Sequence, residues 1–342
     1  MRRLSIIFCS LLAMFMAGCT KDIATHAPVP VQLEVSSVDM KAMINSSSQI
    51  RNLPFGVFAF DKAAVSLAAD DELMMRNQSA VGVVTGGKSS LKLSKTSYYP
   101  LNKSTEFAFY SYYAYPLDKI TSEVTQTQAL VKIPVTGVYD VLWAKSSVDG
   151  GYNAGYIRDG GAHPSFHFSH PTACLSFTAN IENEIANTHV RLSSLSLVAP
   201  EQATLCVADI KNPENEGRFV SAGDDVLKLA INDSYSGNLN LLLSQERQKC
   251  CQDVFIVPGK PTFTVKASFV IRGAGADGTP GTSDDVIQNA NAELILRAGD
   301  GKVFEPGYIY SFNLKMKSPT QVTFEIGGDD QIKVEGFKPA FQ

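Results

Sequence analysis

Thr262-Phe263-Thr264-Val265-Lys266-Ala267-Ser268-Phe269-Val270 is the stretch that decides the fold class. Phe263, Val265, Ala267 and Phe269 recur at a period of two, and alternate residues of a strand point to the same face. The pattern predicts an antiparallel strand with one buried face and one solvated face. The sequence contains no stretch with the 3.6-residue period of a long helix. The chain is therefore predicted to be all-β.

Similar short strands are predicted on both sides of this stretch. Val31-Gln32-Leu33-Glu34-Val35 alternates at period two, whereas the apolar run Phe55 to Phe60 is typical of a buried strand. Clusters of Gly, Pro, Asn and Ser separate the segments. Short strands at regular spacing favour a β-sandwich. Further strands are predicted at residues 80–85, 91–93, 107–115, 129–134, 141–144, 165–168, 173–179, 190–197, 202–209, 238–243, 254–257, 262–271, 292–298, 308–315 and 321–326.

A glycine-rich interval from Asp149 to Gly161 divides the series of predicted strands into two halves. The length of the chain is sufficient for two ordinary domains. We therefore predict two β-sandwich domains in tandem, an N-terminal domain at 31–164 and a C-terminal domain at 165–342.

Phe107-Ala108-Phe109-Tyr110-Ser111-Tyr112-Tyr113-Ala114-Tyr115 is the most aromatic segment. The favoured interpretation is a central strand that packs rings on one face and presents tyrosines on the other. The alternative is that the exposed tyrosines form a surface on which sugars stack.

The first residues have the features of an export signal. Arg2-Arg3 precedes an apolar run from Leu4 to Phe15, and Met16-Ala17-Gly18-Cys19 follows. Small residues before a cysteine resemble a bacterial lipobox, so 1–18 is predicted to be a lipoprotein signal peptide and Cys19 its lipidation site. A plain secretory signal is the alternative. Residues 19–30 are polar and contain prolines, which favours a tether between lipid and domain.

Charge and hydropathy exclude some classes of partner. Loss of residues 1–18 removes Arg2 and Arg3 from the 30 basic residues, leaving 28 against 34 acidic residues and a net charge of −6. This balance gives no basic footprint for nucleic acid. No later stretch approaches the ~20 apolar residues of a membrane-spanning helix.

The remaining cysteines and the histidines leave alternatives open. In an exported protein Cys174, Cys206, Cys250 and Cys251 either form disulfides or remain as buried thiols. The adjacent pair is awkward to close on itself, so a disulfide would join one of the two to Cys174 or Cys206. The histidines cluster within nine residues, but residues three apart on a strand face opposite ways, so surface or interdomain positions are favoured over a zinc site. They are His163, His167 and His170.

The glycine-rich loop from Gly275 to Asp285 has the composition of a cation-binding site. Asp277, Asp284 and Asp285 would supply the hard oxygen ligands that Ca²⁺ takes. The spacing does not match an EF-hand, and a solvated hairpin loop without a metal is the stronger interpretation. No other cofactor is predicted.

The sequence lacks two motifs of catalytic sites, the G-x-S-x-G elbow and the H-E-x-x-H motif. The chain is therefore not predicted to be an enzyme.

Several motifs, in their order along the chain, resemble the fimbrillin (Mfa-like) family of type V pilus subunits. They follow the lipobox at Cys19 and extend almost to the end of the chain. They are Phe55-Gly56-Val57-Phe58-Ala59-Phe60, Tyr98-Tyr99-Pro100, the aromatic run with Pro116, Val141-Leu142-Trp143-Ala144-Lys145, Phe166-His167-Phe168-Ser169-His170 and Phe304-Glu305-Pro306-Gly307-Tyr308-Ile309-Tyr310.

This resemblance implies two transthyretin-like β-sandwich domains and export as a surface lipoprotein of the outer membrane and fimbrium. It also implies assembly by donor-strand exchange with other pilus subunits, of the same or another kind. In that scheme a protease cuts after Arg51 and removes the strand Val31 to Val38. The tail from Gln331 to Phe341 would be the donor, with Ile332, Val334 and Phe337 as its apolar residues.

The family resemblance does not decide whether the protein is a stalk, tip or anchor subunit. It also leaves open whether the protein binds a ligand on a host or bacterial surface. The alternative function is a surface lipoprotein that acts as a glycan-binding module.

Overall fold

The computed structural model describes residues 27–38, 46–68, 73–101, 105–183, 186–223, 225–229, 231, 241–299, 301–318, 321–326 and 333–336. The expected signal peptide at 1–18, the lipidation site Cys19 and most of the expected tether lie outside these residues. Two of the three donor residues, Ile332 and Phe337, also lie outside them.

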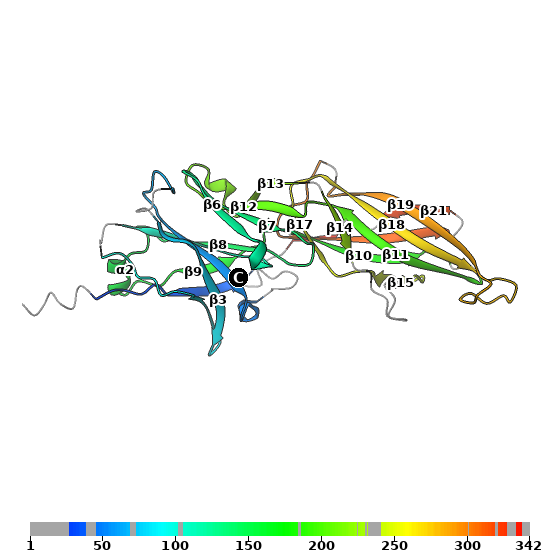
Figure 1. The fold of residues 1–342 in the computed structure, drawn as a ribbon, viewed down its shortest axis with the longest axis horizontal. Helices are drawn as coiled ribbons and strands as arrows, with labels where there is room; N and C mark the ends of the chain where they lie inside the picture. The colour runs from blue at the N-terminus through cyan, green and yellow to red at the C-terminus, as the bar shows by residue number, and fades with distance from the viewer. Residues whose placement is uncertain are drawn as a thin grey trace, which may run out of the picture.

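The protein is all-β and elongated, with two sandwich-like units placed end to end (Figure 1). The described residues form four sheets, which we call A, B, C and D. Sheets A and B make up the N-terminal unit, and sheets C and D make up the C-terminal unit. None of the helices among the described residues is long and apolar enough to cross a membrane.

Sheet A forms the core of the N-terminal unit. Its order is β8 (Leu142–Ser146), β5 (Phe107–Tyr113), β2 (Pro54–Asp61), β3 (Leu73–Thr85), β4 (Lys88–Leu93), β1 (Leu33–Val38) and β9 (Ser165–Phe168). The sheet curls until its two ends meet. Trp143 N, on β8, donates to Ser169 O at 3.0 Å just after β9, and Ser169 N donates to Trp143 O at 2.9 Å. Its concave face therefore encloses a separate apolar core, which includes Leu33, Phe55 and Phe166.

Sheet B covers part of the outer face of sheet A. Its order is β13 (Arg218–Ala222), β12 (Gln202–Asp209), β7 (Gln128–Pro134) and β6 (Thr121–Val124). Leu205 and Val207 of β12 pack in one cluster with Phe58 of β2 and Tyr110 of β5. Strands β2 and β5 are consequently buried on both faces, which explains their near-continuous apolar sequences.

Sheets C and D form a face-to-face sandwich around the largest apolar cluster. Sheet C has the order β14 (Val226–Leu229), β11 (Thr188–Val198), β18 (Thr262–Gly273) and β19 (Val286–Arg297), with β15 (Leu241–Leu242) paired to β11. Sheet D has the order β16 (Gln248–Lys249), β10 (Ala173–Ile181), β20 (Tyr308–Ser318) and β21 (Gln321–Ile326), with β17 (Val254–Ile256) on β10 and β22 (Lys333–Gly336) on β20. The period-two stretch falls on β18, and its expected inward residues Phe263, Val265, Ala267 and Phe269 are all buried.

Short helices connect these strands. They are the 3₁₀ helices η2 (Ser47–Ile50), η4 (Leu117–Lys119) and η5 (Pro213–Asn215) and the α-helix α2 (Ala154–Arg158), which lies inside the glycine-rich interval. Asn153 caps α2 by accepting a hydrogen bond from Tyr156 N.

The sheets do not divide at the expected boundary between residues 164 and 165. β9 pairs in parallel with β1, so residues 165–168 belong to sheet A. After β10 and β11 the chain returns to the N-terminal unit, where β12 pairs with β7. The cause is the inward face of β12, whose apolar side chains cover the outer face of sheet A. Residues 202–222 therefore belong to the N-terminal unit.

Buried side chains also join the two units at their junction. Val135, Ala203 and Val257 form a small apolar cluster of their own. Phe255 N, on β17, donates to the carbonyl of Gly137 at 2.9 Å. The loop after β7 is thereby attached to sheet D.

Candidate functional site

Strand β1 is an interior strand of sheet A. It is antiparallel to β4, with Leu33 opposite Leu91, and parallel to β9, with Val35 opposite Phe166. Leu33, Val35 and Val38 point into the core and are 2%, 6% and 5% exposed. Removal of β1 would therefore leave a slot with an open strand edge on each side and an apolar floor.

The residues before β1 extend this contact. Val31 N donates to Ser97 O at 2.9 Å, and Tyr99 N donates to Val29 O at 2.9 Å. Val29 and Val31 are buried in the same core as β1. The end of the expected tether thus packs as part of sheet A, since it satisfies backbone groups that would otherwise be unpaired.

Arg51, the expected processing site, follows η2 on the surface. Its guanidinium is exposed and donates from Nη2 to Val84 O at 3.2 Å. The peptide bond after it is held firmly, because Asn52 N donates to Gly82 O at 2.9 Å and Gly82 N donates to Leu53 O at 2.9 Å. Ile50, on the other side of Arg51, is fully buried. The Arg51 side chain is accessible, whereas the adjacent backbone is attached to β3.

Gly82 permits this attachment. A Cβ atom at that position would lie 2.0 Å from the Ile50 carbonyl oxygen. Gly82 was not identified from the sequence. A glycine inside a strand predicts a bulge or a close backbone contact, but not which segment makes that contact.

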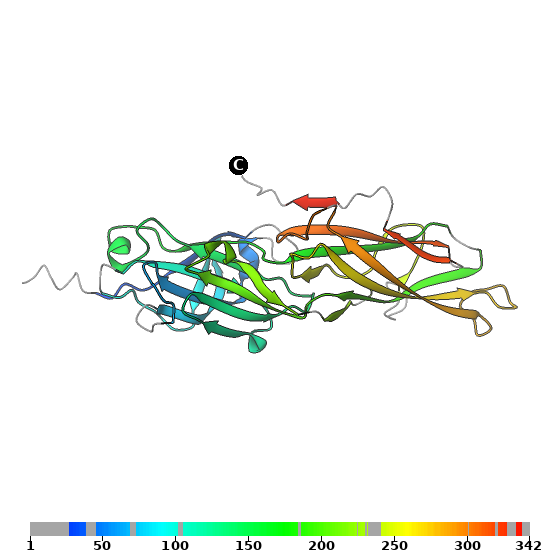
Figure 2. The ribbon, with the colours of Figure 1, turned by 90° about the horizontal axis from the view of Figure 1, so that it is seen from above.

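The expected donor tail has one described strand, β22. It pairs antiparallel with the first half of β20, with Val334 opposite Tyr310, and β21 pairs with the second half, with Ile326 opposite Leu314. Because β10 occupies the other edge of β20, β22 and β21 follow one another along a single edge (Figure 2). The tail strand thus belongs to sheet D, whereas the slot that β1 would leave lies in sheet A.

The expected calcium loop joins β18 to β19. Asp277 N donates to Asp284 Oδ2 at 3.2 Å, and Gly281 N donates to Asp285 Oδ2 at 2.7 Å. Hydrogen bonds from Thr282 Oγ1 and from the backbone of Asp277 lower the pKa of Asp284. Across the described part of the chain, no three His, Cys, Asp or Glu side chains are grouped so that they could hold a metal ion. Calcium binding at this loop stays a prediction, and the carboxylates already act as acceptors for the loop backbone.

The histidines do not converge. His170 is buried and its Nδ1 lies 2.6 Å from Asp140 Oδ2, whereas His167 on β9 contacts Ser37 Oγ on β1. His163 lies before β9, where its Nδ1 is buried without a hydrogen-bond partner. Asp140 was not identified from the sequence, and its position before the short strand β8 gave no local signal.

The cysteines Cys174, Cys206, Cys250 and Cys251 are all buried, and none of them is joined in a disulfide. Of the two alternatives left open, the structure has the buried thiols. Burial, with added repulsion from Asp209 and Glu216, raises the pKa of Cys206 to about 12. Cys250 Sγ lies 3.4 Å from the Phe177 carbonyl oxygen, to which it donates.

The expected exposed face of the aromatic strand does not exist. Every residue of β5 is buried, because sheet B covers the face that was predicted to be solvated. Tyr112 donates through its hydroxyl to Asn77 Oδ1 at 2.9 Å, and burial raises its pKa to about 12. The prediction that tyrosines on the free face of this strand stack against sugars is therefore wrong.

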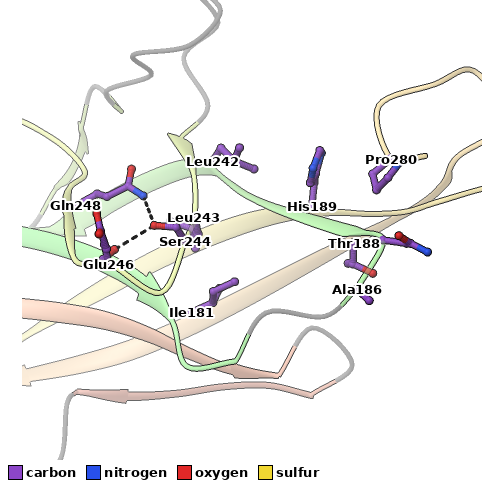
Figure 3. Close-up of a pocket in the computed structure, with 11 residues that line it drawn as sticks. Ile181, Ala186, Thr188, His189, Leu242, Leu243, Ser244, Glu246, Gln248 and Pro280 are labelled. Carbon is purple, nitrogen blue, oxygen red and sulfur yellow. Dashed lines mark hydrogen bonds between the residues drawn. The ribbon is translucent and has the colours of Figure 1, made fainter. Parts of the chain in front are cut away.

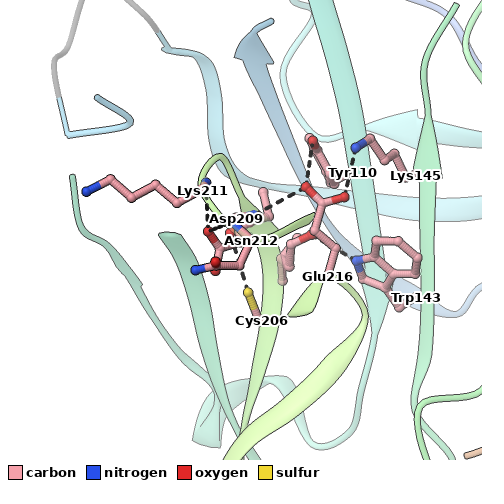
Figure 4. Close-up of polar contacts among 10 residues, drawn as sticks. Tyr110, Trp143, Lys145, Cys206, Asp209, Lys211, Asn212 and Glu216 are labelled. Atoms are coloured by element: carbon pink, nitrogen blue, oxygen red, sulfur yellow. Dashed lines mark hydrogen bonds and ion pairs between the residues drawn. The ribbon is translucent and has the colours of Figure 1, made fainter. Parts of the chain in front are cut away.

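Polar side chains between sheets A and B form a connected network (Figure 4). Glu216 accepts hydrogen bonds from Tyr110 Oη at 3.1 Å and Lys145 Nζ at 2.8 Å. Asp209 accepts from Gln128 Nε2 at 2.7 Å and from Asn215 Nδ2 at 3.0 Å. Each carboxylate is satisfied by donors within the protein, so the network links the two sheets and presents no reactive group.

A hollow of about 920 Å³ lies at the far end of the C-terminal unit (Figure 3). Two of its polar lining residues bind each other, because Gln248 Nε2 donates to Ser244 Oγ at 2.7 Å. Its lining mixes aliphatic and polar side chains from both sheets, and the described residues in it form no acid–base pair.

Comparisons with known proteins agree with this architecture. A family model described as fimbrillin-like matches residues 46–327. Among solved structures, a fimbrial protein from Bacteroides vulgatus has 14% sequence identity and a TM-score of 0.60, and the match covers 90% of this chain and 99% of that one.

Other similar structures have lower scores. A putative cell adhesion protein from Bacteroides uniformis has a TM-score of 0.48 and 14% identity, with 91% and 98% of the two chains covered. The fimbrial anchor protein Mfa2 from Porphyromonas gingivalis has a TM-score of 0.37 and 11% identity, with 88% and 95% covered. No match is found among curated proteins.

The family model spans most of the chain, and the resemblance inferred from the motifs is confirmed. The order of strands, the sandwich layers and this match lead to one conclusion: the chain belongs to the fimbrillin-like family.

Proposed function

We propose that the protein is a subunit of a cell-surface fimbrium, exported as a lipoprotein and assembled by exchange of β1 for a strand of a neighbouring subunit. Its partners are other pilus subunits and, through acylated Cys19, the outer membrane. The protein acts as a structural and adhesive component and not as an enzyme.

The position of β1 is the observation that carries this proposal. Its backbone pairs with β4 and β9, and Leu33, Val35 and Val38 fill the core below. Burial of one such side chain is worth about 1.5–3 kcal/mol. A slot of this kind is unstable when empty, and an extended segment with apolar residues at period two would fill it.

The surroundings of Arg51 support cleavage that is controlled by local opening of the backbone next to it. The guanidinium is exposed, but the backbone hydrogen bonds to Gly82 keep the Arg51–Asn52 peptide bond against β3. A protease binds its substrate as an extended chain, so cleavage requires this short attachment to open locally. Cleavage would separate β1 covalently from β2 while leaving its sheet hydrogen bonds in place.

The location of the tail supports exchange between molecules. β22 is attached to sheet D, and the β1 slot lies in sheet A of the other unit. β22 pairs over only four residue positions, from Tyr308 to Ser311. A short edge strand of this kind is released more readily than an interior strand.

The test is cleavage with an arginine-specific protease followed by size-exclusion chromatography. We expect the cut protein to form ladders of oligomers at high concentration, and a chain lacking residues 331–342 to be cut but to stay monomeric. Arg51→Lys is the matched control, because it resists the arginine-specific enzyme and is still cut by trypsin. A wild-type protein that is cut at Arg51 and remains monomeric would disprove strand exchange by this route.

Lipid anchoring is tested separately. Cys19→Ser should shift the protein from the membrane fraction to the soluble fraction, since an acyl chain contributes about 0.8 kcal/mol per buried CH₂. Metabolic labelling with a fatty acid should mark the wild type and not the variant. Absence of label on the wild type would contradict the lipobox assignment.

A further inference from the structure

Strand β19 forms one edge of sheet C and is long for an edge strand (Figure 1). All 12 of its residues pair with β18, from Arg297 opposite Thr262 to Val286 opposite Gly273, without a bulge. Its sequence contains no proline and no lysine. Edge strands that resist association are usually short, bulged or protected by proline or lysine. The β19 edge is therefore suited to pairing with another strand.

The backbone of β19 has one unpaired row of hydrogen-bonding groups. Ala298 N donates to Pro261 O at 3.2 Å, directly after the pair of Arg297 with Thr262, so Ala298 and Pro261 are a hydrogen-bonded pair. Such pairs alternate with non-hydrogen-bonded pairs, so the even-numbered residues of β19 bond to β18. The N–H and C=O groups of the odd-numbered residues, from Ile287 to Arg297, point to the outer edge. Among the described residues no strand pairs with that edge, although β21 of sheet D lies close to β19.

The side chains of the same odd-numbered residues face solvent and include two isoleucines. Ile287 and Ile295 are 56% and 50% exposed, whereas the alternate residues Leu294 and Leu296 are buried in the core. The two isoleucines lie at equal distances along the strand from Asn291, one on each side. The exposed apolar side chains of this edge are thus arranged symmetrically about Asn291.

We propose that β19 pairs antiparallel with β19 of a second copy of the chain, about a twofold axis at Asn291. This register sets Ile287 opposite Ile295 of the second copy, and Ile295 opposite Ile287 of that copy. Asn289 comes opposite Glu293, where an amide N–H can donate to the carboxylate. Odd-numbered residues always meet odd-numbered residues, so the unpaired backbone groups of the two edges face each other. Sheet C would then continue across both copies.

Opposite charges meet at the ends of the aligned strands. Arg297 comes opposite Asp285 of the second copy, and the twofold axis repeats this pair at the other end. The Arg297 side chain forms no ion pair and no hydrogen bond with the described residues. Asp285 is exposed and accepts from Gly281 N at 2.7 Å, but a carboxylate has about four acceptor positions and can bind a second donor. Cross-strand pairs of opposite charge stabilise antiparallel strands.

Other registers match this edge less well. A twofold axis at Ile295 would set Glu293 opposite Arg297, but it would leave the exposed Ile287 outside the contact. An axis between two residues would align odd-numbered with even-numbered residues, and the latter already bond to β18. The axis at Asn291 satisfies the backbone, the two isoleucines and the charged ends together.

Pairing through the edges alone gives a weak contact. Stable protein interfaces bury about 1,200–2,000 Å², and two strands that meet only at their edges bury less. The pair should therefore form in concentrated protein and dissociate on the dilution that accompanies size-exclusion chromatography. It involves β19 alone, so it does not depend on the exchange of β1 and should form in the uncut chain.

The test is cross-linking of the concentrated, uncut full chain by a short bis-maleimide, in variants with one added cysteine. Asn291→Cys should cross-link to itself, because position 291 lies opposite its own copy with Cα atoms about 5.5 Å apart. Ile287→Cys and Ile295→Cys should each give no dimer alone, since like positions lie roughly 27 Å apart along the ladder. A mixture of these two variants should give dimer. The wild type is the control, because its cysteines in the described sheets are buried.

A charge exchange tests the ends of the contact. Added to Asn291→Cys, either Arg297→Asp or Asp285→Arg sets like charges opposite each other at both ends and should lower the dimer yield about fivefold or more. An equal mixture of the two charge variants contains pairs with opposite charges at both ends, so the yield should recover. Thermal melting verifies that each variant is folded.

Several outcomes would overturn the proposal. Cross-linking of Asn291→Cys no stronger than that of the wild type would show that the two β19 edges do not meet. Dimers from Ile295→Cys alone would contradict the axis at Asn291, as would a mixture of the charge variants that does not recover. Cross-linking that is lost on deletion of residues 331–342 would assign the edge to the tail of a neighbouring chain.

Discussion

Asp140 and His170 form a buried pair where the two units meet: Nδ1 of His170 lies 2.6 Å from Oδ2 of Asp140, and both side chains are almost fully buried. Thr172 Oγ1 donates to Asp140 Oδ1 at 2.7 Å, and Val141 N donates to the same oxygen at 2.8 Å. Gly307 N, before β20, donates in turn to the Thr172 carbonyl at 2.7 Å. One carboxylate thus holds the segment that leads from β9 of sheet A to β10 of sheet D.

Asp140→Ala should destabilise the protein strongly, because the donors of His170, Thr172 and Val141 lose their shared acceptor in a buried site. Loss of one partner from a buried pair costs about 3–5 kcal/mol in the free energy of unfolding. Thr172→Val removes a single hydrogen bond at nearly constant volume and should cost about 1 kcal/mol. Urea unfolding measures both values. If Asp140→Ala costs no more than Thr172→Val, the carboxylate does not organise the junction.

Asp209 should make stability depend on pH in the acid range. Burial raises its pKa, but hydrogen bonds from Gln128, Asn215 and the backbone N–H groups of Asn212 and Lys211 outweigh burial and lower it to about 2. Because the folded pKa lies below the unfolded value of about 3.9, this stabilisation is present above pH ~4 and is lost as the pH falls towards 2. Urea unfolding at pH 5, 3 and 2 should show a smaller decrease for Asp209→Asn than for the wild type. Parallel curves for the two proteins would contradict the assignment.

The four cysteines of the described sheets should resist alkylation in the folded protein. Only the thiolate reacts, and burial both blocks access and raises the pKa of Cys206 to about 12. Iodoacetamide at pH 8 should leave Cys174, Cys206, Cys250 and Cys251 unmodified, whereas addition of urea should expose all four. Peptide mass spectrometry provides the readout. Rapid labelling of Cys206 in the native state would show that sheet B opens locally.

The acidic loop should be held by its own hydrogen bonds and not by calcium. Asp284 accepts from Thr282 Oγ1 at 2.7 Å and from Asp277 N at 3.2 Å. We expect EDTA to leave the melting temperature of the wild type unchanged, while Asp284→Ala lowers it slightly because exposed hydrogen bonds contribute about 1 kcal/mol or less each. A chelator effect in the wild type that disappears when Asp277, Asp284 and Asp285 are changed to alanine would instead identify a calcium site.

The sequence by itself determined the fold class and most of the strands. In the stretch from Thr262 to Val270 the period of two identified the inward residues correctly, because the alternation of side chains is a local property of a strand. The order of motifs identified the family, which the match over residues 46–327 confirms. Arg51 was expected to be the processing site, which stays a prediction; its side chain is exposed, and the hydrogen bonds of the adjacent backbone to Gly82 were not identified from the sequence.

The tertiary structure decided which strands pair, and local periodicity contains no information on that choice. Residues 202–209 have the pattern of a strand, but only the free outer face of β2 and β5 explains why they leave the C-terminal half and pair with β7. The same long-range packing buries the tyrosines of β5 on both faces. A strand pattern specifies one buried face per strand, whereas the neighbour that covers each face depends on contacts between residues far apart in sequence.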